Sequence, residues 1–311
     1  MDRIVRISLL CVASLLVLSG CIRDQILPCP PLSVSIGVLD KNWSNIGDAV
    51  GTEFDSLLHV KDDALPFREY ISTICYSLKN LSTGDSAVVT ARYVIEHDEQ
   101  RELIVFPDSL PFGQYEITVW GNIQESALSE DFCTVTLHED GDSEAEDIFH
   151  ACDTLDYRYD AAEFNLDLQR TVGCLLIYAF HLPEGVDYST KDIEGVYGNV
   201  GKGLQYSGPV SVHTEMDWGK DCGNVMTATC TAPSEEKAVL QLAFYDTDQS
   251  SAAGSVRLSQ DGTYMAEPVS VAIRRNELTV LRYDYNPEAD NFNISVLVND
   301  MWMDIHDMIM D

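Results

Sequence analysis

The sequence predicts an all-β protein made of two antiparallel β-sandwich domains in tandem. Apolar and polar residues alternate with period two in many short runs, as in strands that bury one face. Turn-forming residues recur roughly every 8–15 positions, which is typical of the spacing between sandwich strands. Few windows place apolar residues at helical spacing. The length of 311 residues fits two domains better than one or three.

The first sandwich is expected over residues 31–139. Residues 32–38 (LSVSIGV) and 115–121 (YEITVWG) show the clearest alternation, and we expect each to be a half-buried strand. Short helices between strands are expected within residues 45–59 and 61–72. The remaining strands of this domain are expected at residues 71–78, 87–95, 103–106 and 132–138.

An acidic linker is expected at residues 140–150, because residues 138–147 (HEDGDSEAED) are rich in carboxylates and poor in apolar side chains. The second sandwich would then occupy residues 151–311. Its run 172–180 (VGCLLIYAF) is apolar throughout and predicts a strand buried on both faces. The glycine-rich residues 195–208 predict a long loop. Further strands are expected at residues 164–168, 225–231, 238–245, 269–274, 278–283 and 292–298.

Residues 1–20 are typical of an export signal peptide. Arg3 and Arg6 give a positive start, and residues 7–18 form an apolar core too short to span a bilayer. The core ends in Leu-Ser-Gly-Cys at residues 18–21, which resembles the bacterial lipobox. This resemblance implies cleavage between Gly20 and Cys21 and lipid attachment to Cys21, with residues 21–30 as a lipidated tether. The alternative is an ordinary secretory signal in which Cys21 is incidental.

The charge of the chain excludes several partners. There are 51 Asp and Glu against 19 Lys and Arg, a net charge of −32. Nucleic-acid binding needs a surplus of basic side chains, and so does docking on anionic lipid through a basic patch. We therefore expect membrane attachment through a covalent lipid, with the acidic body standing off an anionic membrane surface.

Enzyme motifs are missing from the sequence. It contains no G-x-S-x-G and no H-E-x-x-H, and its seven histidines are scattered singly. We expect no catalysis, no cofactor, no metal site and no small-molecule substrate.

Eight short motifs, spread over nearly all of the mature chain, carry a family resemblance. They are residues 21–24 (CIRD), 29–34 (CPPLSV), 41–43 (KNW), 111–122 (PFGQYEITVWGN), 152–157 (CDTLDY), 168–170 (LQR), 275–279 (RNELT) and 291–294 (NFNI). As an ordered set they resemble the FimB-type fimbrial anchor lipoproteins, the anchoring subunits of major fimbriae.

The resemblance implies two transthyretin-like sandwiches in a surface-exposed lipoprotein of the outer membrane of anaerobic gut and oral gram-negative bacteria. Such a protein anchors a fimbrium and contacts its shaft subunits through strands. In related shaft subunits a protease removes an N-terminal strand, and the C-terminal strand of a neighbour fills the groove that is left. An anchor keeps its lipidated N-terminus, so its own groove stays filled.

The C-terminal tail is too apolar to be left in solvent. Residues 292–298 alternate as a last strand, and the alternation changes phase after Asn299-Asp300. Two interpretations stay open, packing within its own domain or contact with a partner subunit. The candidate partner-binding residues are Ile294, Val296, Val298, Met301, Trp302, Met303 and Ile305.

Two other functions remain open beside the anchor. A surface glycan-binding lipoprotein would expose Trp43 and Trp218 on one concave face. A shaft or tip subunit would need a protease-sensitive arginine between its first strand and the domain body. Arg68, Arg92 and Arg101 are the candidates for that arginine.

Overall fold

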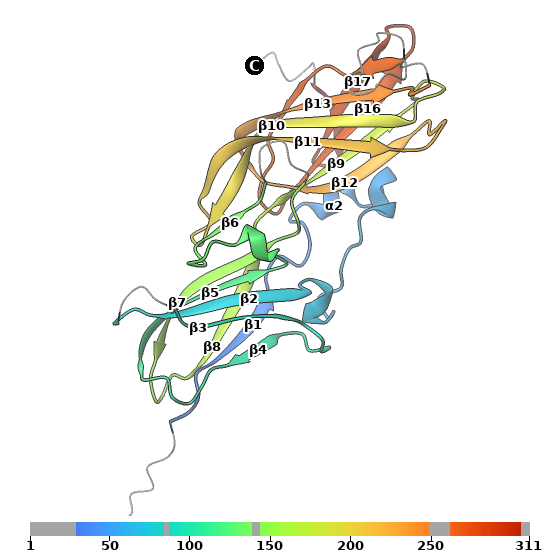
Figure 1. Ribbon diagram of the computed structural model, residues 1–311. Coiled ribbons are helices and arrows are strands. Elements are labelled where there is room, and N and C mark those ends of the chain that lie inside the picture. The colour runs from blue at the N-terminus through green and yellow to red at the C-terminus, as the bar shows by residue number, and fades with distance from the viewer. Residues whose placement is uncertain (1–28, 84–86, 139–143, 249–261, 306–311) are drawn as a thin grey trace, which may run out of the picture.

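The computed structural model describes residues 29–83, 87–138, 144–248 and 262–305, and these form two β-sandwiches joined end to end (Figure 1). The predicted all-β fold is confirmed: the described elements are strands apart from four short helices. Each sandwich is mainly antiparallel and contains one parallel pair, β1 with β8 in the first and β9 with β16 in the second.

The first sandwich is a seven-stranded sheet folded into two layers. One layer has the order β3-β2-β5-β7 and the other β8-β1-β4, and only two residue pairs between β7 and β8 join them. Apolar side chains of both layers meet between them, including Ile36, Leu78 and Ile117. The strands are β1 (Ser33–Val38), β2 (Thr73–Asn80), β3 (Ala87–Val94), β4 (Glu102–Val105), β5 (Gly113–Gly121), β7 (Phe149–Tyr157) and β8 (Glu163–Arg170).

The second sandwich packs a six-stranded sheet against a five-stranded one. The first of these contains β6 (Thr134–Thr136), β10 (Tyr188–Gly201), β11 (Tyr206–Asp217), β13 (Ser234–Tyr245), β14 (Thr263–Met265) and β15 (Val269–Val271). The other has the order β12 (Val225–Thr231), β9 (Gly173–Phe180), β16 (Leu278–Asn286), β17 (Asn291–Val298) and β18 (Met301–Asp304). As predicted, β9 is buried on both faces: Ile177 faces the core between the sheets, and Leu176 faces the outer side.

The segment between β1 and β2 covers that outer side. It carries the short helices α2 (Ile46–Ala49), η1 (Glu53–Ser56) and η2 (Phe67–Glu69), which agrees with the expected helices. Phe54 is fully buried against the cluster that contains Leu176 and Val280. The segment between β1 and β2 therefore packs on the outer face of the second sandwich. The remaining short helix is η3 (Glu125–Ala127).

The sheets do not divide at the expected linker. β7 begins at Phe149, at the end of residues 140–150, but pairs with β5 over nine residues, and β8 runs parallel to β1. β6 precedes the linker but pairs with β10 of the second sandwich. The boundary at residues 140–150 is therefore wrong for the strand pairing, because the first sandwich is completed only at Arg170. Acidic composition indicated exposure, but it carried no information about which strands pair across it.

The long loop expected at residues 195–208 is also wrong. β10 and β11 pair through almost all of this segment and leave only residues 202–205 to turn the chain. Gly195 has a φ of +84° and lies where the register between the two strands shifts. At Gly198 a β-carbon would lie 2.9 Å from the carbonyl oxygen of Gly208. These glycines therefore allow a bulge and a close approach of two strands.

Candidate partner-binding surface

The predicted lipid-attachment site lies outside the described residues. Gly20 and Cys21 belong to residues 1–28, and the description begins at Cys29. None of the helices in the described residues is long and apolar enough to cross a membrane. Within the same residues, no group of three or more His, Cys, Asp or Glu side chains is placed to hold a metal ion.

The C-terminal candidate residues form a β-hairpin. β18 turns back on β17 and pairs with it antiparallel through residue 304. Asn299 and Asp300 have φ values of 49° and 62°, so both adopt the left-handed conformation of a two-residue type I′ turn. This turn produces the change of phase seen in the sequence. The described part of the tail is thus docked on its own domain.

The seven candidate residues do not share one surface. Ile294 and Ile305 are buried in the core of the second sandwich. Trp302 is half-buried, 6.5 Å from the ring of Phe54 and under the guanidinium of Arg282. Val296 is also half-buried. The exposed members are Val298, Met301 and Met303, with exposed fractions of 37%, 64% and 40%.

The exposed members lie beside an unpaired strand edge. β18 is the last strand of its sheet, and no strand of the described chain pairs with its outer side. The residues that flank a two-residue turn form a hydrogen-bonded pair, here Val298 with Met301. Hydrogen-bonded and non-bonded pairs alternate along a hairpin, so the N–H groups of Trp302 and Asp304 point away from β17. A partner strand could bond to these groups.

A hollow of about 430 Å³ adjoins this hairpin. Val296, Val298 and Ile305 form one side of it, and Val271 of β15 contributes to another. Ser295 fixes the end of β18, because its hydroxyl donates to Asp304 Oδ1 at 2.8 Å. The edge of β18 therefore combines backbone groups that no described strand pairs with and exposed apolar side chains, which are features that strand addition uses, whereas the hollow is lined by β17 and Ile305 and not by β18.

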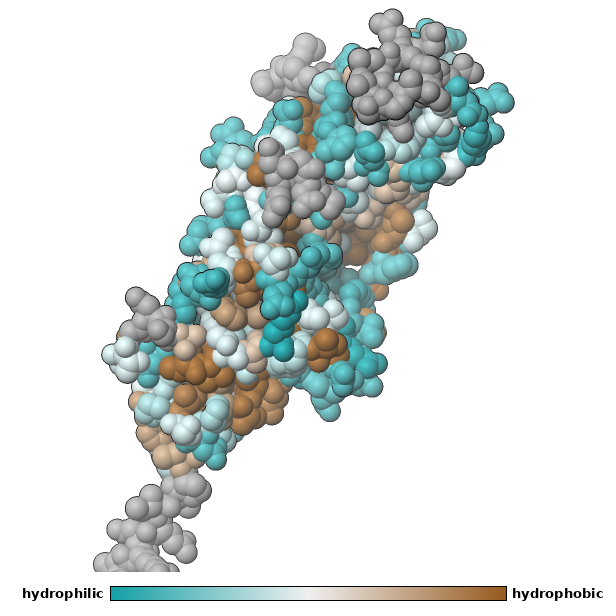
Figure 2. Space-filling view, in the orientation of Figure 1, coloured by the Kyte–Doolittle hydropathy of each residue, from teal (hydrophilic) through white to brown (hydrophobic). Residues whose placement is uncertain are grey.

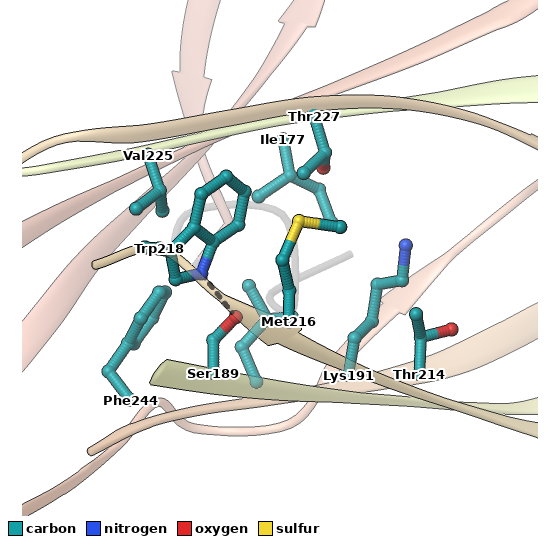
Figure 3. Close-up of a pocket in the computed structure, with 10 residues that line it drawn as sticks. Ile177, Ser189, Lys191, Thr214, Met216, Trp218, Val225, Thr227 and Phe244 are labelled. Carbon is teal, nitrogen blue, oxygen red and sulfur yellow. Dashed lines mark hydrogen bonds between the residues drawn. The ribbon is translucent and has the colours of Figure 1, made fainter. Parts of the chain in front are cut away.

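A second, smaller pocket lies between the two sheets of the second sandwich (Figure 3). Trp218 lines it together with Phe244 and Ile177, and the indole N–H of Trp218 donates to the hydroxyl of Ser189 at 2.8 Å. Its volume of about 30 Å³ holds one water molecule and no sugar ring. Trp218 is half-buried here, so the expectation that it forms an exposed glycan platform is wrong.

Trp43 is not exposed either, because it packs at the junction of the two sandwiches. The guanidinium of Arg170 lies 4.0 Å above its ring and 4.8 Å from the ring of Phe149. Arg170 also binds Asp147 at 2.6 Å and donates to the amide oxygen of Asn276 at 2.7 Å. Residues 41–43, 168–170 and 275–279, which carry the family resemblance, thus converge at one place. The sequence motifs pointed to these residues, but not to this contact.

The first strand is held on both sides within its own domain. β1 pairs with β8 on one side and with β4 on the other. Arg101 directly precedes β4, and its side chain links this strand to the other two. It donates to the hydroxyl and carbonyl oxygens of Ser35 in β1 and binds Asp167 in β8, each at 2.8 Å. Of the arginines considered as cleavage sites, only Arg68 lies between β1 and β2, and it is paired with Asp98 at 2.7 Å.

No protein-family model matches the sequence, and no curated protein matches it either. Similar folds do occur among solved structures. The fimbrial anchor protein Mfa2 from Porphyromonas gingivalis aligns with a TM-score of 0.51 at 12% identity, over 89% of this chain and all of that one. A candidate adhesin from Bacteroides ovatus aligns with a TM-score of 0.54 at 12% identity, over 92% and 98% of the two chains.

A third solved structure carries a different description. Candidate polysaccharide-binding proteins from Bacteroides thetaiotaomicron align with a TM-score of 0.52 at 10% identity, over 88% and 98% of the two chains. At these identities the likeness concerns the fold. It establishes a two-sandwich architecture shared with a fimbrial anchor and with proteins described as adhesins, and none of these three is described as an enzyme.

Proposed function

We propose that this chain is a structural lipoprotein of the outer membrane that anchors a fimbrium. An acyl group on Cys21 holds it in the membrane, and its second domain contacts the first shaft subunit through a strand. The observation that carries the proposal is the edge of β18, which no strand of the described residues pairs with, and the exposure of Met301 and Met303 beside it. The fold shared with a fimbrial anchor supports it.

The retained first strand favours an anchor over a shaft subunit. A subunit that is activated by losing β1 must release it, whereas here β1 has a partner on each side and Arg101 crosses both contacts. The segment that follows β1 is also fixed to the second sandwich, because the side-chain amide of Asn45 donates to the carbonyl oxygen of Leu278 at 2.9 Å and accepts from its N–H at 2.7 Å. Glycan binding is the weaker proposal, because Trp43 and Trp218 are both half-buried.

Two substitutions at Asp304 test the strand contact. Asp304→Pro removes the outward backbone N–H, while Asp304→Ala keeps it; both lose the hydrogen bond from Ser295. We expect shaft subunits to co-purify with the Ala variant and not with the Pro variant. Matching circular dichroism spectra would show that both variants fold. Equal recovery of shaft subunits with the two variants would contradict a partner strand at this edge.

A further inference from the structure

The first sandwich exposes apolar side chains at the end where the chain first joins it. β1 begins at this end, and β4 finishes here with Val105 opposite Ser33. The connections over residues 106–112 and 158–162 lie at the same end, because β5 starts and β7 finishes there. Figure 1 shows these connections beside the point where the described chain begins.

Among the large apolar side chains that face the solvent at this end, four come from β4 and the two connections. Leu103, Val105, Phe112 and Tyr159 have exposed fractions of 59%, 57%, 44% and 52%. Figure 2 shows hydrophobic surface gathered over this part of the first domain. Single exposed apolar residues are ordinary, but a cluster on a chain with a net charge of −32 marks a contact surface. We call these four residues the apolar end.

The local charge at the apolar end is partly balanced. Arg158 lies between two carboxylates, 3.2 Å from Asp156 and 4.0 Å from Asp160. Arg158 and Asp160 belong to the same connection as Tyr159, and Asp156 lies at the end of β7. Arg158 thus offsets one of the two carboxylates, and the group keeps a net charge of −1, so apolar contact rather than charge must carry any binding of this end to lipid.

The beginning of the described chain limits what can cover this end. The hydroxyl of Tyr157 donates to the carbonyl oxygen of Pro30 at 2.7 Å and so fixes the chain beside the apolar end. Cys21 lies eight residues before Cys29, and eight residues span at most about 29 Å. If Cys21 is acylated, the bilayer must lie within about 29 Å of Cys29, where the described chain begins beside the apolar end.

We propose that the apolar end is a membrane-contact face that rests on the phospholipid bilayer in which the tether is anchored. The inference rests on the proposed function, because it uses the acylated Cys21. Tyr159 carries an aromatic ring with a polar hydroxyl, of the kind that settles at the headgroup level, and Phe112 adds a purely apolar ring. The protein then stands end-on, with its acidic second domain directed away from the membrane and towards the fimbrium.

Quenching of tryptophan fluorescence by brominated lipid tests this orientation. The full lipidated protein is reconstituted into phosphatidylethanolamine vesicles that contain dibrominated phosphatidylcholine. Phe112→Trp places a probe in the apolar end, and Met265→Trp places one at a position 60% exposed in the second domain. Each variant is compared with the parent protein, which supplies the signal of its own four tryptophans.

We expect bromolipid to quench the added tryptophan of Phe112→Trp at least twofold and to leave that of Met265→Trp unchanged. Quenching of both probes would mean that the protein lies flat, and quenching of neither would mean that it stands off on its tether; either result overturns the inference. A dimer that shields the probe at residue 112 from lipid would overturn it as well.

A second measurement separates this inference from the anchoring proposal. Intact mass determined before reconstitution reports whether Cys21 is acylated. If Cys21 is not acylated, the anchoring proposal fails. Flotation with the same vesicles then tests whether the apolar end binds lipid without an anchor. Replacing Phe112 and Val105 by serine should lower such binding about tenfold, from the apolar area withdrawn from lipid. Unchanged binding would overturn the membrane-contact face.

Discussion

Replacing Arg170 by methionine tests how the two sandwiches are held together. The side chain is only 4% exposed, and its charge is met by Asp147, Asn276 and the faces of Trp43 and Phe149. Methionine keeps an unbranched apolar stem and removes the guanidinium. Breaking a buried ion pair on one side costs about 3–5 kcal/mol. Asp147 is 34% exposed and regains water, so we expect a loss of about 3 kcal/mol.

The matched control is Arg275→Met, at the same junction. Arg275 is 35% exposed, lies 3.6 Å from Asp40 and donates to Gln169 Oε1 and to the carbonyl oxygen of Arg170, so its loss should cost about 1–1.5 kcal/mol, less than that of Arg170. Unfolding in guanidinium chloride, followed by circular dichroism and tryptophan fluorescence, measures both variants. For Arg170→Met we also expect the two probes to diverge as the sandwiches uncouple. Equal losses in the two variants, with coincident transitions, would refute the role given to Arg170.

Two further predictions concern single sites. A hydrogen bond to Asp192, aided by Glu215, raises the pKa of His213 above its usual 6.5. Folding therefore favours the protonated form of His213, and the stability that this contributes is present below pH 6.5 and lost as the pH rises through the folded-state pKa. We expect His213→Ala to destabilise the protein more at pH 5.5 than at pH 8.5. An equal loss at both pH values would count against the interaction of His213 with Asp192. At Gly173 a β-carbon would lie 2.5 Å from the carbonyl oxygen of Arg274, so Gly173→Ala should lower the free energy of unfolding by about 2 kcal/mol, while Gly47→Ala, with open space around it, should not.

Local patterns were sufficient to predict most strands. Alternation predicted β1 and β5, and the continuous apolar run predicted the doubly buried β9, because the side-chain period follows directly from strand geometry. The order of the strands was beyond such patterns. β7 pairs with β5 across the acidic linker, and β8 runs parallel to β1 although about 125 residues separate them in sequence. No local signal encodes these pairings.

The candidate site was predicted in part. The sequence showed that the tail is apolar and changes phase at Asn299-Asp300, but it left docking and donation open. The structure shows that the change of phase is a tight turn, so the set separates into buried residues such as Ile294 and exposed ones such as Met301. Asn-Asp is a composition that tolerates positive φ, and this turn chemistry was the signal that could have predicted the hairpin.

The junction at Arg170 escaped prediction for another reason. Trp43, Arg170 and Asn276 lie in three motifs that are far apart in sequence, and each motif by itself suits an ordinary strand or turn. Their meeting depends on how both sandwiches are folded. A stacked guanidinium is a property of the assembled structure, and spacing along the chain does not reveal it.

The anchoring account is tested most directly by the intact mass of the protein isolated from outer membranes, together with the identity of the proteins that co-purify. If the protein is a fimbrial anchor, we expect the isolated chain to begin at Cys21, to carry acyl groups there and to retain β1. We also expect it to be isolated with fimbrial shaft subunits. A chain that begins beyond β1 and carries no lipid would contradict the anchoring account and would instead indicate a shaft or tip subunit.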